Sequence, residues 1–183
     1  MMSPHKIATY KYIFTLLIVA FGITVAVSQD WNQYGSSAND SLYFSTYSPG
    51  PVDNNPPSKV VELNLDKPET ITLIRTYHWN YGRGQDPGAN GYIRILDSNG
   101  NEKFKSQLIY AENGVGGVSN VYWVAYGPPP IIEKSGPMRS DYPPLNWKLE
   151  PGKYIIDDSD RSTWSYNLGS GEKGITLVYA LNE

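Results

Sequence analysis

Two stretches of the chain carry most of the residue types that could do chemistry. Residues 77–91 read YHWNYGRGQDPGANG, and residues 157–167 read DDSDRSTWSYN. Tryptophan and tyrosine rings pack on the flat C–H faces of sugars, while amide, carboxylate and guanidinium groups bind the sugar hydroxyls. The two stretches therefore predict a carbohydrate-binding site built from loops on a rigid scaffold. The candidate ligand-binding residues are Trp79, Asn80, Tyr81, Arg83, Trp164, Tyr166 and Asn167.

The tryptophans also have a structural interpretation. Trp164 could seal one end of a hydrophobic core, with its indole N–H bonded to a loop carbonyl. Glycines at positions 169, 171 and 174 would let the backbone pack closely around such a ring. Each of Trp164 and Trp79 could therefore be a platform, whose exposed ring stacks on a sugar, or a plug, whose buried ring seals the core; both interpretations remain open.

Three acids in four residues raise the possibility of calcium. In an EF-hand loop that starts at Asp158, the sixth and twelfth positions should be glycine and glutamate, but they are Thr163 and Gly169. A looser calcium site formed by Asp157, Asp158 and Asp160 is one alternative. The other is that these acids accept hydrogen bonds from nearby N–H groups and fix a turn. Strand alternation would send Asp157 and Asp158 to opposite faces, which favours the turn, and no other cofactor is predicted.

Catalytic signatures are weak. His78 is the only histidine after residue 28, no G-x-S-x-G motif accompanies it, and the chain has no cysteine. Neighbouring acids in one loop offer no reason for their pKa values to separate, as a glycosidase would require. The glycine-rich residues 111–120 lack the lysine of a phosphate-binding loop. We therefore predict a protein that is not an enzyme, with a small hydrolase as the less favoured alternative.

The N-terminus predicts export. Lys6 and Lys11 precede an apolar run from Ile13 to Val27, and small residues follow at positions 26–28. We interpret residues 1–28 as a cleaved signal peptide; the alternative is a membrane anchor, for which the run is rather short. Either alternative predicts a protein that is secreted or held on the outer side of the cell surface.

The charge of the chain limits its partners, and its composition limits its fold class. Removing residues 1–28 takes away two lysines and no acid, which leaves 13 basic and 18 acidic side chains. This negative balance disfavours nucleic acid as a partner, and it disfavours a membrane except through residues 1–28. The chain has 15 Tyr, 17 Gly and 14 Pro, which together favour β-strands joined by turns over helices.

Strand-like segments recur along most of the chain. Residues 29–58 predict an extended, proline-rich segment with a possible short strand at 42–44, and a β-domain follows over 59–183. About eight short strands without an amphipathic helix predict an all-β fold, a two-layer antiparallel sandwich of jelly-roll type. An immunoglobulin-like arrangement is the alternative. The expected strands span residues 59–65, 70–78, 91–97, 102–110, 121–126 and 174–182, and residues 146–157 form two more, joined by a Pro-Gly turn.

The number of strands between the two aromatic loops predicts whether these loops lie at the same end of the sandwich. If consecutive strands simply alternate in direction, the loop after the second strand and the loop after the seventh lie at opposite ends of the sandwich. Trp79 would then share an end with residues 113–120 and not with Trp164.

Two motifs resemble an uncharacterised module of secreted bacterial and archaeal proteins. The motif TYHWNxGxG matches residues 76–84, and PGxYxIxDSxxxTWSxN matches residues 151–167, within a resemblance that covers residues 70–178. Tyr81 and Arg161 depart from the residues usual at their positions. The resemblance implies an extracellular β-sandwich, often joined to other modules, and it implies no activity, ligand or catalytic residue.

We therefore expect an exported, non-enzymatic module that binds a glycan or another surface polymer through loop aromatics. The alternative is a structural or assembly module whose partners are other extracellular proteins. Exposure separates the two interpretations, because open ring faces on Trp79 and Tyr81 favour binding and buried indoles favour structure.

Overall fold

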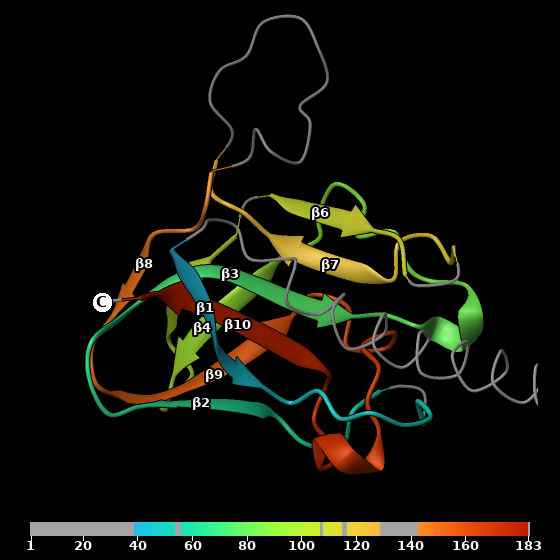
Figure 1. The fold of residues 1–183 in the computed structure, drawn as a ribbon, viewed down its shortest axis with the longest axis horizontal. Helices are drawn as coiled ribbons and strands as arrows, with labels where there is room; N and C mark the ends of the chain where they lie inside the picture. Colours follow the sequence, from blue (N-terminus) through green and yellow to red (C-terminus); the bar gives the residue numbers. More distant parts are fainter. Residues whose placement is uncertain (1–38, 54–55, 107, 115–116, 129–142, 183) are drawn as a thin grey trace, which may run out of the picture. The chain divides into compact units, whose positions relative to one another are not determined.

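Strands make up most of the regular structure in the computed structural model, shown in Figure 1. The structure describes residues 39–53, 56–106, 108–114, 117–128 and 143–182, all of which belong to one unit, residues 35–183. The predicted signal peptide or anchor lies outside these residues. Within the described part of the chain, no helix is both long enough and apolar enough to cross a membrane.

The described residues contain ten strands and two short 3₁₀ helices. The helices are η1 (Asn80–Gly82) and η3 (Leu168–Ser170). The strands are β1 (Asp40–Ser45), β2 (Val61–Leu65), β3 (Glu69–Tyr77), β4 (Ile93–Asp97), β5 (Glu102–Lys105), β6 (Ile109–Glu112), β7 (Tyr122–Ala125), β8 (Trp147–Leu149), β9 (Gly152–Asp158) and β10 (Thr176–Leu181).

The strand order is that of a jelly roll. One sheet has the order β1-β10-β3-β7-β6, with β8 also paired to β3, and the other has the order β2-β9-β4-β5. Every pairing between these strands is antiparallel. The pairs β1–β10, β2–β9, β3–β7 and β4–β5 are those of one long hairpin rolled into two layers. The predicted jelly-roll sandwich is therefore confirmed, with β6 and β8 as additions to its eight strands.

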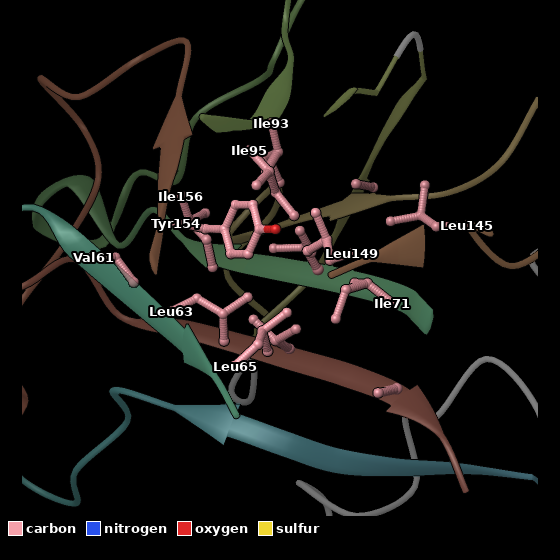
Figure 2. Close-up of a cluster of buried hydrophobic side chains, with 14 of the residues drawn as sticks. Val61, Leu63, Leu65, Ile71, Ile93, Ile95, Leu145, Leu149, Tyr154 and Ile156 are labelled. Atoms are coloured by element: carbon pink, nitrogen blue, oxygen red, sulfur yellow. The ribbon is translucent and has the colours of Figure 1, made fainter. Parts of the chain in front are cut away.

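Alternating side chains build the core between the layers. In β2, Val61, Leu63 and Leu65 are buried while Glu62 and Asn64 are exposed, as expected of a strand with one solvated face. Figure 2 shows side chains from both sheets converging on one interior. Its buried residues include Val61, Leu63, Leu65, Ile71, Ile93, Ile95, Leu145, Leu149, Tyr154 and Ile156.

The single strand predicted over residues 102–110 is wrong. The segment forms β5 and β6, which belong to different sheets. Ser106 is buried at the break, where its hydroxyl donates to the carbonyl of Leu108 at 2.6 Å and its backbone N–H donates to Ile93 O at 2.9 Å. From Ile109 onward the chain pairs with β7 in the other sheet.

Strands β7 and β8 lie end to end along the same edge of β3. Residues 74–77 of β3 pair with β7, and residues 69–71 pair with β8. Both strands are antiparallel to β3, so the chain does not reverse between them. Residues 129–142, most of the connection between these two strands, lie outside the described residues.

The segment predicted as an extended connector contributes to the sandwich. Strand β1 lies within residues 29–58 and pairs with β10. After it, Asp53 and Pro57 make backbone contacts with residues 159–175: Asp53 N donates to Tyr166 O at 2.9 Å, and Arg161 donates to Pro57 O at 3.0 Å. The sandwich therefore begins well before residue 59.

Candidate functional site

Four loops meet at one end of the sandwich, here called the loop end. Their described residues are 46–53 with 56–60, 78–92, 113–114 with 117–121, and 159–175. Strands β1, β3, β6 and β9 run toward this end, and β2, β4, β7 and β10 start from it. Because β7 and β8 share a direction, the prediction from the number of strands is wrong by one strand. Trp79 shares an end with residues 113–120, as expected, but also with Trp164; its backbone N–H donates to Ser165 Oγ at 2.9 Å.

A tight turn presents Tyr81 to the solvent. Trp79 O accepts hydrogen bonds from the N–H groups of Gly82 and Gly84, at 2.9 and 3.1 Å. Asn80 Nδ2 donates to Gly84 O at 3.0 Å, so the predicted sugar-binding amide of Asn80 is used within the turn. Trp79 is half-buried, and Gly82 packs against its ring. Tyr81, at the tip, is 64% exposed.

The turn holds Tyr81 in a strained backbone conformation. Asn80 and Tyr81 have φ angles of 44° and 56°, in the left-handed region. Asparagine tolerates this region, but for tyrosine it costs about 1–2 kcal/mol, and an exposed ring recovers little of that by packing. Residues in such conformations cluster at functional sites, where the rest of the structure enforces them.

The neighbouring loop supports the same turn. A Cβ atom at Gly84 would lie 1.8 Å from Ser119 O, so the two backbones are in direct contact there. Gln85 N donates to Asn120 O at 3.0 Å, and Trp123 Nε1 donates to Gln85 O at 2.6 Å. The base of the 78–91 loop is therefore fixed to the sandwich, whereas Arg83 near its tip is exposed.

Trp164 is a plug rather than a platform. Its side chain belongs to the core cluster and is 2% exposed, and Nε1 donates to Ile175 O at 3.1 Å. Gly174 lies against the indole, where a Cβ atom would come within 2.2 Å of the ring. With no ring face open to solvent, Trp164 cannot stack on a sugar, which corrects its assignment as a ligand-binding residue.

Asn167 and Tyr166 also serve the loop itself. Asn167 is buried and caps η3, accepting a hydrogen bond from Ser170 N at 2.8 Å, and its Nδ2 donates to Ser48 O at 2.8 Å. Its amide is therefore not available to a ligand, which corrects that assignment too. Tyr166 is half-buried. Of the seven predicted residues, Tyr81 and Arg83 are exposed and Trp79 is half-buried beside them.

The three acids have protein partners. Arg94 Nη2 lies 2.8 Å from Asp157 Oδ2, on the outer face of β9. On the opposite face, Asp158 Oδ1 accepts from Asp160 N at 2.9 Å, which is the turn-fixing bond considered above. The described part of the chain holds no group of three or more His, Asp or Glu side chains that could bind a metal ion. The looser calcium site therefore gains no support.

The Asp160 carboxyl is held ionised by its own turn. Burial alone would raise its pKa, but hydrogen bonds from Ser162 and Thr163 and the charge of His78 lower that pKa below its ordinary value. Thr163 Oγ1 donates to Asp160 Oδ2 at 3.0 Å. Asp160 thus stabilises the fold above the pKa of an ordinary aspartate, near 3.9, and that contribution is lost as the pH falls below it.

A hydroxyl, an imidazole and a carboxylate do converge beside this turn. His78 Nδ1 lies 2.9 Å from Thr163 Oγ1, and His78 Nε2 lies 3.2 Å from Asp158 Oδ2. The side chains of His78 and Asp158 are both 0% exposed. The residue types of a catalytic triad therefore lie together, but the histidine and the carboxylate are fully buried.

Tyr77, at the end of β3, gives an alkaline signature that can be measured. Burial raises the pKa of its phenol to about 12, with a smaller contribution from Tyr47. The folded protein thus favours the neutral phenol; its stabilising effect is complete below pH 10, the pKa of an ordinary tyrosine, and is lost as the pH rises toward 12. We expect the unfolding midpoint to fall over this range more steeply in the wild type than in Tyr77→Phe. Equal slopes in a urea titration series would contradict the assignment.

Comparison of the chain with protein-family models, with curated proteins and with solved structures found no match. The resemblance to a secreted bacterial and archaeal module therefore stays a prediction.

Proposed function

We propose that this protein is an exported, non-enzymatic binding module that recognises a glycan or a similar surface polymer at its loop end. The observation that carries the proposal is Tyr81, an aromatic residue that is 64% exposed and has a left-handed backbone conformation. A structural role gives no reason to place an aromatic residue there, because glycine or asparagine would fit the turn at lower cost.

The surroundings of Tyr81 fit the face of a sugar. Trp79 offers a second, half-buried ring in the same turn, and Arg83 adds an exposed donor that can meet hydroxyl or carboxylate groups. The turn is fixed to the 113–121 loop, so little freedom would be lost when a ligand binds. A pre-organised site of this kind gains affinity by avoiding ordering costs.

A protein partner is the second candidate, and Leu168 is the observation that favours it. This side chain is 79% exposed on η3, which lies at the same end of the sandwich as Tyr81. An aliphatic side chain contributes little to a hydroxyl-rich sugar face but packs well at a protein interface. The two candidates thus predict different residues as anchors.

Affinity electrophoresis in gels containing soluble polysaccharides separates these candidates. We expect one polysaccharide to retard the wild type, Tyr81→Ala to lose about tenfold or more in affinity, and Leu168→Ala to match the wild type. The two substitutions each remove one exposed side chain from the loop end, so they are matched. Retardation that depends on Leu168 and not on Tyr81 would refute the glycan proposal, as would the lack of retardation by any polysaccharide in a broad panel.

Backbone strain at Tyr81 makes a separate prediction. We expect Tyr81→Gly to stabilise the protein by about 0.5–1 kcal/mol, because relief of the left-handed strain exceeds the added entropy of the unfolded chain. Tyr81→Ala keeps the strained backbone without the ring and should leave stability close to that of the wild type. Chemical denaturation measures both values; a destabilised Tyr81→Gly variant would show that the ring packs to structural advantage.

A further inference from the structure

His78 lies at the base of the loop that presents Tyr81, and both of its ring nitrogens face oxygen atoms. Nδ1 is 2.9 Å from Thr163 Oγ1, and Nε2 is 3.2 Å from Asp158 Oδ2 and 3.1 Å from Thr76 Oγ1. The ring of Trp123 stacks on the imidazole with a centroid distance of 4.0 Å. The side chain is completely buried, so these neighbours determine where its protons are.

The hydroxyl groups of Thr76 and Thr163 both donate their protons to groups other than the imidazole. A threonine hydroxyl donates one hydrogen bond only. Thr76 Oγ1 lies 2.7 Å from Asp158 Oδ2, and Thr163 Oγ1 lies 3.0 Å from Asp160 Oδ2, so each donates to a carboxylate. Toward the imidazole, both hydroxyl oxygens can then only accept. Each ring nitrogen must therefore carry a proton.

Either neutral form of the ring breaks this pattern. Without a proton on Nδ1, the Thr163 hydroxyl would have to turn from Asp160 to the ring, which would leave two oxygen lone pairs facing each other at 3.0 Å. Without a proton on Nε2, Asp158 Oδ2 would lose the ring as a donor, and the Thr76 hydroxyl could satisfy only one of the two groups. With Asp158 ionised, only the doubly protonated ring satisfies all of these contacts.

The charges around the His78 ring agree with a ring that carries both protons. Asp158 comes from the end of β9 and faces Nε2, and Asp160 reaches Nδ1 through Thr163. The other elements packed against the ring contribute uncharged groups, Thr76 from β3 and Trp123 from β7. A buried cation between two carboxylates is well compensated, whereas a neutral ring would leave the buried Asp158 carboxylate without a counter-charge.

We infer that His78 is an imidazolium ion that fastens the 78–91 loop to residues 158–163, so that loss of one ring proton loosens the loop end. This is a regulatory device built into the fold, and it does not depend on the identity or existence of a ligand. A bare ring nitrogen would leave one of these contacts without its donor, so the two segments are held less tightly when the ring loses a proton.

Nitrogen NMR of the histidine rings in the purified protein tests the proton count directly. The chain has two histidines, and the resonance that disappears in His78→Asn identifies the buried ring. We expect both ring nitrogens of His78 to be protonated at about pH 7. A ring with one bare nitrogen at that pH would overturn the inference, and this measurement on the wild type requires no variant of Asp158.

The free energy of unfolding at about pH 7 tests the fastening of the loop by the His78 imidazolium. We expect Asp158→Asn to lower the ratio of folded to unfolded protein by about tenfold or more, because the buried imidazolium loses its counter-charge. Asp157→Asn is the matched control, since it removes the adjacent carboxylate on the opposite face, and it should lower the ratio less. Equal effects of the two substitutions would overturn this role of His78.

Discussion

Replacing Trp164 by alanine is expected to destabilise the protein by about 3–5 kcal/mol. The indole lies in the core cluster at the loop end, and Gly174 lies against its ring at a distance that leaves no room for a Cβ atom. Removing the ring leaves a cavity that the strands on both sides cannot close, and it takes the indole N–H from the carbonyl of Ile175. The fall in Tm should be on the order of 10 °C.

Trp164→Phe is the control for this prediction. It keeps an aromatic ring in the core but removes the N–H donor, so we expect about 1–2 kcal/mol of destabilisation. Chemical denaturation followed by tryptophan fluorescence and by circular dichroism measures both variants. If Trp164→Ala costs less than about 1 kcal/mol, the indole is not a structural plug, and its assignment as a ligand platform becomes open again.

Replacing Gly84 by alanine is expected to cost about 3 kcal/mol. The residue has a φ of 66°, which strains any side chain, and its Cβ would lie 1.8 Å from Ser119 O. Since that neighbour is backbone, the 78–91 loop and the 113–121 loop must move apart. The same displacement should weaken ligand binding through Tyr81, because the turn loses its support.

Gly88→Ala separates strain from contact. Gly88 has a φ of 62° in the same loop, but a Cβ there would meet nothing within 4 Å. We expect this variant to cost only about 1 kcal/mol, through the left-handed backbone alone. Equal effects of the two substitutions on the free energy of unfolding would show that the loops do not support each other through Gly84.

Local patterns were sufficient to predict the architecture but not the connections between the layers. The alternation in β2 and the apolar run in β7 are properties of the individual strands, so they can be recognised without knowledge of the strands' neighbours. The break at Ser106 has no such signal, because the alternation of Lys103, Phe104 and Lys105 continues smoothly into it. The shared direction of β7 and β8 depends on both strands pairing with β3, which no neighbouring residue reveals.

The sequence was sufficient to predict which residues lie in the loops of the candidate site, but not which of them are buried. The sequence pointed to Tyr81 and Trp164 equally, since each is an aromatic residue in a polar, glycine-containing loop. Their different exposures arise from Gly174, which lies ten positions after Trp164, and from the turn around Gly84. The network around His78 was missed for a similar reason, because its partners Asp158 and Thr163 are 80 and 85 residues away in the chain.

The central claim is that strain at Tyr81 is retained because its ring binds a ligand. Thermal unfolding of the wild type and Tyr81→Gly, with and without the polysaccharide that retards the wild type, tests this most directly. A ligand at 100 times its Kd adds about 2.7 kcal/mol of stability. We predict that Tyr81→Gly unfolds at a higher temperature than the wild type without polysaccharide, and that only the wild type gains several degrees with it. A variant that gains as much as the wild type from the polysaccharide would contradict the claim.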